Sequence, residues 1–84
     1  MLFSEIAPPE AAHQESRLIW TGRKEAVIEG HRGLFSYETK CVRVRAGTGL
    51  WTVTGEGLTL GFYGADDVLI KGRIESVALS EAAQ

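Results

Sequence analysis

Glycines divide most of this chain into short apolar runs, and this spacing constrains the fold more than any other feature of the sequence. Nine of the ten glycines lie between runs rich in valine, isoleucine, threonine and aromatic residues. Such side chains suit a pleated sheet, whereas glycine tolerates the positive φ angles of tight turns. The pattern therefore predicts an all-β domain of about eight short, mostly antiparallel strands.

The predicted strands are residues 17–21, 26–29, 34–37, 40–45, 50–54, 58–63, 68–71 and 74–79. The connections between them are too short for a crossover helix, which argues against a parallel α/β sheet. We expect a small sandwich or roll. A short β-solenoid is the alternative, because stacked coils also produce regularly spaced glycines.

The first sixteen residues differ from the rest of the chain. Pro8 and Pro9 interrupt any regular element, and the segment carries three acidic residues and no basic one. Residues 17–75, in contrast, carry all nine basic residues against seven acidic ones. We therefore expect a partly ordered N-terminal arm over residues 1–16 and a single β domain over residues 17–84.

Alternation along the runs predicts which side chains form the core, because successive residues of a strand point to opposite faces. The expected core residues are Leu18, Trp20, Ala26, Ile28, Val42, Val44, Trp51, Val53, Leu58, Leu60, Phe62, Val68 and Ile70. The opposite face is also partly apolar, with Ile19, Val27, Phe35, Tyr37, Leu50, Tyr63 and Leu69. A small sheet that is apolar on both faces must fold over itself or bind another chain.

The segment KCVRVR places Arg43 and Arg45 on one face, and no acidic residue lies between Glu38 and Glu56. Arginine and aromatic residues are enriched at protein interfaces. We predict a protein-interaction surface made of Phe35, Tyr37, Arg43, Arg45 and Leu69. The arginine strip could contact an acidic protein or anionic lipid head groups, and the simpler interpretation is a solvated outer face.

No pattern in the sequence indicates catalysis, a cofactor or a metal site. His31 has no second histidine or cysteine at ligand spacing, and we expect it to be an exposed turn residue. Asp66 and Asp67 are expected to cap a turn, since a calcium loop supplies more oxygen ligands than two. Cys41 is the single cysteine, so it forms no internal disulfide.

The charge and hydropathy of the chain argue against some classes of partner and some cellular locations. The net charge of −2 argues against nucleic-acid binding, which requires a basic surface. No run approaches the length of a membrane span, and no signal peptide is recognisable. We therefore expect a cytoplasmic protein that reaches a membrane, if at all, through a partner.

Three segments in order carry a family resemblance: VIEGHRGLFSY, GLWTVTGEGLTL and LIKGRIESVAL. Together with the preceding WTG, they make roughly residues 18–79 resemble the YabP/YqfC family of sporulation proteins, and most closely its YqfC branch. The resemblance implies a small protein of the mother cell of a spore-forming bacterium, acting beside a larger membrane-associated sporulation protein. The family provides no catalytic residue to carry over.

Two functional hypotheses follow. The first is a non-enzymatic protein-interaction or assembly domain in sporulation, which binds a membrane-associated sporulation protein or forms a homo-oligomer. The second is a β domain that binds a small ligand or an anion, with the glycine-rich turns lining the site.

Overall fold

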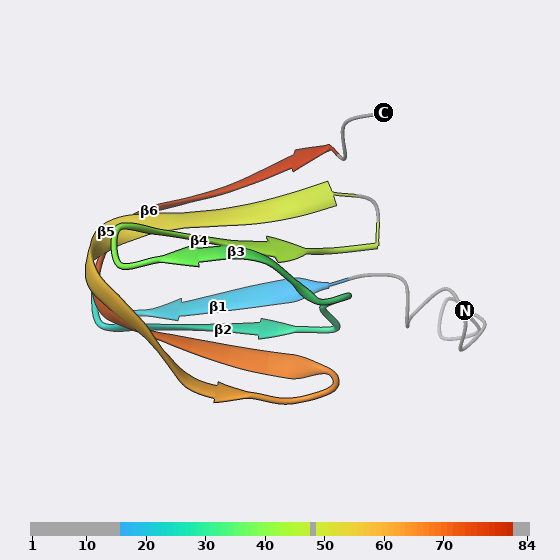
Figure 1. The fold of residues 1–84 in the computed structure, drawn as a ribbon, viewed down its shortest axis with the longest axis horizontal. Coiled ribbons are helices and arrows are strands. Elements are labelled where there is room, and N and C mark those ends of the chain that lie inside the picture. The colour runs from blue at the N-terminus through green and yellow to red at the C-terminus, as the bar shows by residue number, and fades with distance from the viewer. Residues whose placement is uncertain (1–15, 48, 82–84) are drawn as a thin grey trace, which may run out of the picture.

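A computed structural model gives the fold of the chain, and it describes residues 16–47 and 49–81 (Figure 1). This part of the chain contains six strands and no helix, which confirms the all-β prediction. The strands are β1 (Arg17–Thr21), β2 (Glu25–Glu29), β3 (Leu34–Glu38), β4 (Cys41–Arg45), β5 (Gly49–Tyr63) and β6 (Asp67–Glu81).

The eight predicted strands become six because two pairs of them are continuous. The runs 50–54 and 58–63 join in β5, and the runs 68–71 and 74–79 join in β6. Glycines that the sequence suggested as turns between these runs are therefore bends inside two long strands.

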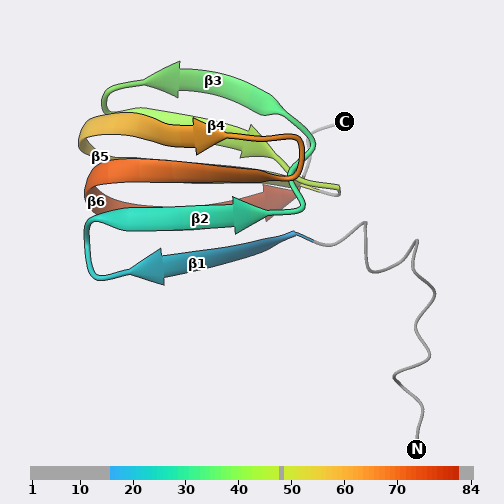
Figure 2. The ribbon, with the colours of Figure 1, turned by 90° about the horizontal axis from the view of Figure 1, so that it is seen from below.

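All six strands form a single antiparallel sheet in the order β1-β2-β6-β5-β4-β3. The long hairpin of β5 and β6 lies at the centre, with the β1–β2 hairpin beside β6 and the β3–β4 hairpin beside β5. Figure 2 shows β1 and β3 at opposite borders of the molecule. Antiparallel hairpins in one sheet correspond to the predicted roll rather than to the coils of a solenoid.

The sheet folds over on itself where β5 and β6 bend. β4 pairs only with residues 50–54 of β5, and β2 pairs only with residues 67–71 of β6. The two halves of each long strand therefore belong to two layers, and Figure 1 shows both strands curving round at one end of the molecule. We call the layer with β3 and β4 the first layer and the layer with β1 and β2 the second layer.

Glycines make the bend possible. A Cβ atom at Gly55 would collide with the backbone carbonyl oxygen of Arg73. Gly72 has a φ of +134°, and a Cβ there would lie 2.6 Å from the carbonyl oxygen of Gly57. The backbones of the two neighbouring strands approach so closely at the bend that no side chain fits between them.

The core lies between the two layers. Nine side chains are completely buried in one cluster: Ala26, Ile28, Val42, Val44, Val53, Leu58, Val68, Ile70 and Ile74. They include residues of β2 and β4, which β6 and β5 separate in the sheet. These two strands reach one cluster because the sheet is folded, and burial of its apolar face is the main force that holds the layers together.

Two residues that the alternation placed in the core, Trp20 and Phe62, are exposed instead. Trp20 lies on the core-facing side, opposite Ala26, but β1 is a border strand and Trp20 remains 40% exposed. For Phe62 the reason is a register shift after Leu60, which pairs Phe62 with Leu69 on the outer face. Such a bulge inserts an extra residue and reverses the alternation beyond it.

The predicted N-terminal arm, except for Ser16, lies outside the described residues. Ser16 is anchored to the domain, since its Oγ accepts a hydrogen bond of 2.7 Å from the indole nitrogen of Trp51. Within residues 16–47 and 49–81 there is no helix long and apolar enough to cross a membrane.

Candidate protein-interaction surface

The first layer presents two arginines on its outer face. Val42 and Val44 of β4 are completely buried, so Arg43 and Arg45, which alternate with them, point away from the core. Both arginines are exposed. The register places Arg43 opposite Thr52 of β5, in a row of short polar side chains that leaves the guanidinium group accessible.

A bulge in β3 adds an aromatic ring to this face. Leu34 pairs with Val44, and Ser36 already pairs with Arg43, so Phe35 is the extra residue of the bulge. Phe35 is 48% exposed, and the guanidinium carbon of Arg45 lies 4.9 Å from the centroid of its ring. This cation–π contact holds the two side chains together on the surface.

The loop before β3 contributes a third arginine. The backbone N–H of Arg32 donates to the carbonyl oxygen of Arg45, and the N–H of Arg45 donates to the carbonyl oxygen of Gly33, both at 2.8 Å. A hollow at this end of β4 is lined by Arg32, Phe35, Arg45, Ala46, Gly47, Gly49 and Leu50. We call Phe35, Arg43 and Arg45, with Arg32 at the rim, the arginine face.

Sequence reasoning missed Arg32. The residue joins the arginine face only through the backbone pairing of its loop with the end of β4. No local pattern in the sequence signals that contact.

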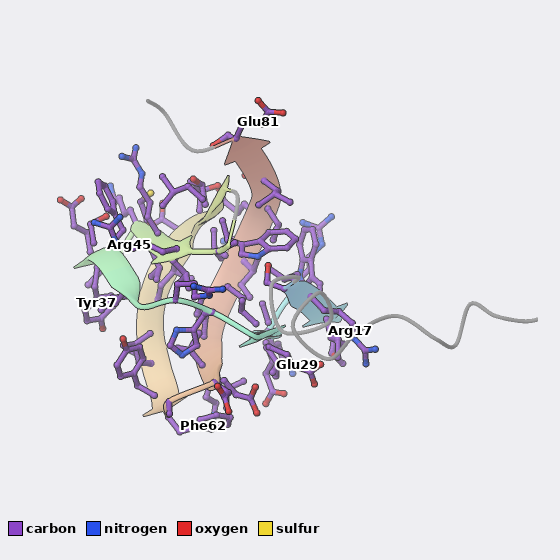
Figure 3. All side chains as sticks on the ribbon, turned by 90° about the vertical axis from the view of Figure 1, so that its right-hand side faces the viewer. Arg17, Glu29, Tyr37, Arg45, Phe62 and Glu81 are labelled. Carbon is purple, nitrogen blue, oxygen red and sulfur yellow. The ribbon has the colours of Figure 1, made fainter. Side chains whose placement is uncertain are left out.

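The charges of the arginine face lack an acidic partner within the described part of the chain. The one ion pair found there joins Arg17 and Glu29, on the second layer, with 3.4 Å between Nε and Oε1. Figure 3 shows Arg17 and Glu29 on the opposite side of the molecule from Arg45 and Tyr37. The arginine face is therefore open to an external anion or acidic protein segment.

Tyr37 does not lie on the arginine face. It pairs with the buried Val42, which places it on the core-facing side of β3, and its hydroxyl donates to the carbonyl oxygen of Leu58 at 3.2 Å. The predicted alternation put Tyr37 on the outer face with Phe35. The bulge at Phe35 reverses that alternation, and Tyr37 instead connects the two layers.

Leu69 lies on the outer face of the second layer. It is part of a row of apolar side chains that crosses all four strands of this layer in register: Ile19, Val27, Leu69 and Phe62. The five residues predicted as one interaction surface are therefore distributed over three places, and only Phe35, Arg43 and Arg45 come together.

His31 is buried, with 6% of its surface exposed, so the prediction of an exposed turn residue was wrong. Its Nδ1 accepts a hydrogen bond of 2.9 Å from the N–H of Gly33, and its Nε2 lies 2.8 Å from the carbonyl oxygen of Gly64. The neutral imidazole with its proton on Nε2 satisfies both bonds. The ring also stacks on Tyr63, with 5.1 Å between ring centroids.

These contacts explain why sequence reasoning failed for His31. Gly64 is 33 residues away along the chain, and no local pattern reveals that the two loops meet. The N–H groups of Gly30 and His31 also donate to the carbonyl oxygen of Asp66. His31 therefore links the β2–β3 loop to the β5–β6 turn by hydrogen bonds, which is a structural role.

In the described residues, no three histidine, cysteine, aspartate or glutamate side chains gather closely enough to hold a metal ion.

The strand pairing and the surface contacts together define a small all-β domain made of one folded sheet, with an arginine-rich outer face.

The chain belongs to the YabP family, which is associated with sporulation: the model of that family matches residues 12–84. The family resemblance of the sequence is thereby confirmed at the level of the family. Comparison with curated proteins and with solved structures gave no significant match.

Proposed function

We propose that this chain is a non-enzymatic protein-interaction domain of the YqfC branch, and that its arginine face binds an acidic segment of a partner protein during sporulation. The observation that supports this most is the convergence of Phe35, Arg43 and Arg45 on one exposed face. In keeping with the family resemblance, the proposed partner is a membrane-associated sporulation protein, and the proposed location is the cytoplasm of the mother cell.

The chemistry of the arginine face suits a carboxylate-bearing partner. A guanidinium group presents a planar set of N–H donors that matches the two oxygens of a carboxylate. The ring of Phe35 orients Arg45 before binding, which reduces the conformational entropy lost when a partner is bound. The charges accelerate encounter with an acidic segment, and the exposed ring provides apolar contact area.

A quantitative capture experiment from lysates of sporulating cells tests this function. The bait is the full chain, either unchanged or with Arg43→Glu and Arg45→Glu together. The matched control is Arg23→Glu with Lys24→Glu, which makes the same charge change in the exposed β1–β2 turn. We expect the arginine-face variant to capture the same partner roughly tenfold less, and the control to capture it normally.

Two outcomes would contradict the proposal. Equal losses in both variants would mean that overall charge, rather than the arginine face, attracts the partner. Unchanged capture by the arginine-face variant would place the binding site elsewhere. Increasing salt should weaken capture by the unchanged chain, since exposed charges more than about 10 Å apart are largely screened at 0.1 M salt.

A further inference from the structure

The second half of β6 has a neighbouring strand on one side only. β2 pairs with residues 67–71 of β6, whereas β5 continues along β6 as far as Glu81. Within the described residues, no strand pairs with the other side of residues 76–81. Their outward N–H and C=O groups therefore form a free edge, which we call the β6 edge.

The β6 edge lacks the features that usually protect a free strand. Its ladder with β5 runs without a register shift from Ser76, opposite Thr54, to Glu81, opposite Gly49. Residues 76–80 contain no charge and no proline. Proteins normally prevent edge pairing with lysines, prolines, bulges or very short strands, so the regular, uncharged stretch 76–80, which lies between Glu75 and Glu81, is suited to pairing with another strand.

The other free strands are protected in these ways. β3 contains the bulge at Phe35 and ends at Glu38, and β1 carries the charged Arg17, which is ion-paired with Glu29 of β2. The second half of β5 contains the register shift after Leu60. Of the free strands in the described part of the chain, the β6 edge is therefore the one best suited to augmentation by an added strand.

The sequence of the β6 edge is nearly palindromic: Ser76-Val77-Ala78-Leu79-Ser80. If two copies pair antiparallel about a two-fold axis at Ala78, Ser76 faces Ser80 of the other copy, and Val77 faces Leu79. Antiparallel pairing about a two-fold axis requires this kind of self-complementarity. An unrelated partner would not require it, and this favours a second copy as the occupant.

The same pairing would cover exposed apolar surface. Val77 and Leu79 pair with Val53 and Trp51, so both point to the core-facing side of the first layer. Leu79 is 55% exposed, the largest exposed fraction among the large hydrophobic residues described. In the two-fold pair, each Leu79 packs beside Val77 of the other copy.

We infer that the β6 edge is a homodimer interface, in which residues 76–80 of two copies pair antiparallel and join the two sheets into one. The two-fold axis closes the assembly at two copies, because each β6 edge is then occupied. The interface is separate from the arginine face, and the inference does not rest on the proposed function.

The flanking charges predict how salt affects this dimer. The register that pairs Ala78 with itself places Glu75 near Glu81 of the other copy at both ends of the interface. Their repulsion is screened by salt, so dimerisation should strengthen as salt rises. Binding at the arginine face should respond in the opposite way.

Disulfide trapping tests the register directly. In a Cys41→Ser background, Ala78→Cys places two thiols face to face at the two-fold axis, within the range of Cα separations that a disulfide spans. Ser76→Cys is the matched control, because its two thiols would lie about 14 Å apart along the paired strands. Adding Ser80→Cys to Ser76→Cys restores facing pairs.

Under mild oxidation we expect covalent dimers from Ala78→Cys and from the Ser76→Cys/Ser80→Cys variant, and none from Ser76→Cys alone. Equal cross-linking of all three variants, or cross-linking of Ser76→Cys only, would overturn the proposed register. Monomers at every concentration, measured for the unchanged chain by sedimentation velocity, would overturn the dimer itself.

A second pair of variants tests which strand edge forms the dimer. It also tests whether dimerisation and capture of the acidic partner are independent. Ala78→Lys places a lysine of each copy at the axis, on an exposed position, whereas Thr21→Lys introduces a lysine at an exposed position of the free strand β1. We expect Ala78→Lys to be a folded monomer that still captures the acidic partner, and Thr21→Lys to remain dimeric. Loss of the dimer in Thr21→Lys, with retention in Ala78→Lys, would assign the interface to β1 and refute the proposal.

Discussion

Gly72→Ala tests whether the fold depends on the bend in β6. The φ of Gly72 is +134°, in a region that side-chain-bearing residues rarely adopt. An alanine Cβ there would lie 2.6 Å from the carbonyl oxygen of Gly57 and 2.9 Å from the Cα of Leu58. Both contacts are with backbone, so no change of rotamer relieves them.

The expected cost combines two effects. Holding a non-glycine residue in such a conformation costs about 1–3 kcal/mol. Forcing extra atoms into a tightly packed site costs about 1–3 kcal/mol more. The sum, about 2–6 kcal/mol, is a large part of the unfolding free energy of a domain of this size, which is on the order of 4–13 kcal/mol.

Gly22→Ala is the matched control for this substitution. Gly22 also has a positive φ, +60°, but a Cβ there meets nothing within 4 Å. It should therefore cost only the conformational penalty of about 1–2 kcal/mol. Because the conformational penalties of the two sites overlap, most of the difference between the two variants reflects the backbone collision at the bend.

Urea denaturation followed by far-UV circular dichroism and tryptophan fluorescence measures both costs. We expect a clearly lower midpoint for Gly72→Ala than for Gly22→Ala, with similar slopes for the two transitions. If both variants had the same midpoint, the close backbone approach of β5 and β6 at the bend would not limit the fold, and our explanation of the bend would be refuted.

Three further predictions use the same assays. Ile70→Ala, at a completely buried position, should lower the unfolding free energy by about 2–5 kcal/mol, and an unchanged urea midpoint would argue against our assignment of the core. His31→Ala should cost about 1–3 kcal/mol, because the N–H of Gly33 and the carbonyl of Gly64 lose their partner; an effect below about 0.5 kcal/mol would show that the loops do not need this contact. Phe35→Ser should leave the domain folded and weaken partner capture, since the ring is half exposed; unfolding would show that Phe35 belongs to the core.

Most of the fold was predictable because strand alternation is a local property. The pairs Ala26 and Ile28, Val42 and Val44, and Val68 and Ile70 were expected on buried faces. All of them are completely buried. A run of four or five residues is enough to define which side chains share a face, so these expectations required no knowledge of how the strands pair.

The errors arose where pairing between strands changes the local pattern. The bulges at Phe35 and before Phe62 reverse the alternation, and they depend on the partner strand rather than on the run itself. The bends at Gly55 and Gly72 look like turns in the sequence because both need glycine. The same holds for the candidate site. Arg43 and Arg45 belong to one strand and lie on one face as predicted, whereas Tyr37 and Leu69 belong to other strands and lie elsewhere.

The strand order has a consequence for how the chain folds during its synthesis. β2 has its second partner in β6, and Glu25 pairs with Lys71 across more than half of the chain. Until β6 has left the ribosome, β1 and β2 form only an isolated hairpin, which is marginally stable in water. Completion of the sheet must therefore await the last strand, and long-range pairing of this kind slows folding. The nascent chain passes through a stage in which its apolar strand faces are uncovered, and this is when a chaperone would bind it.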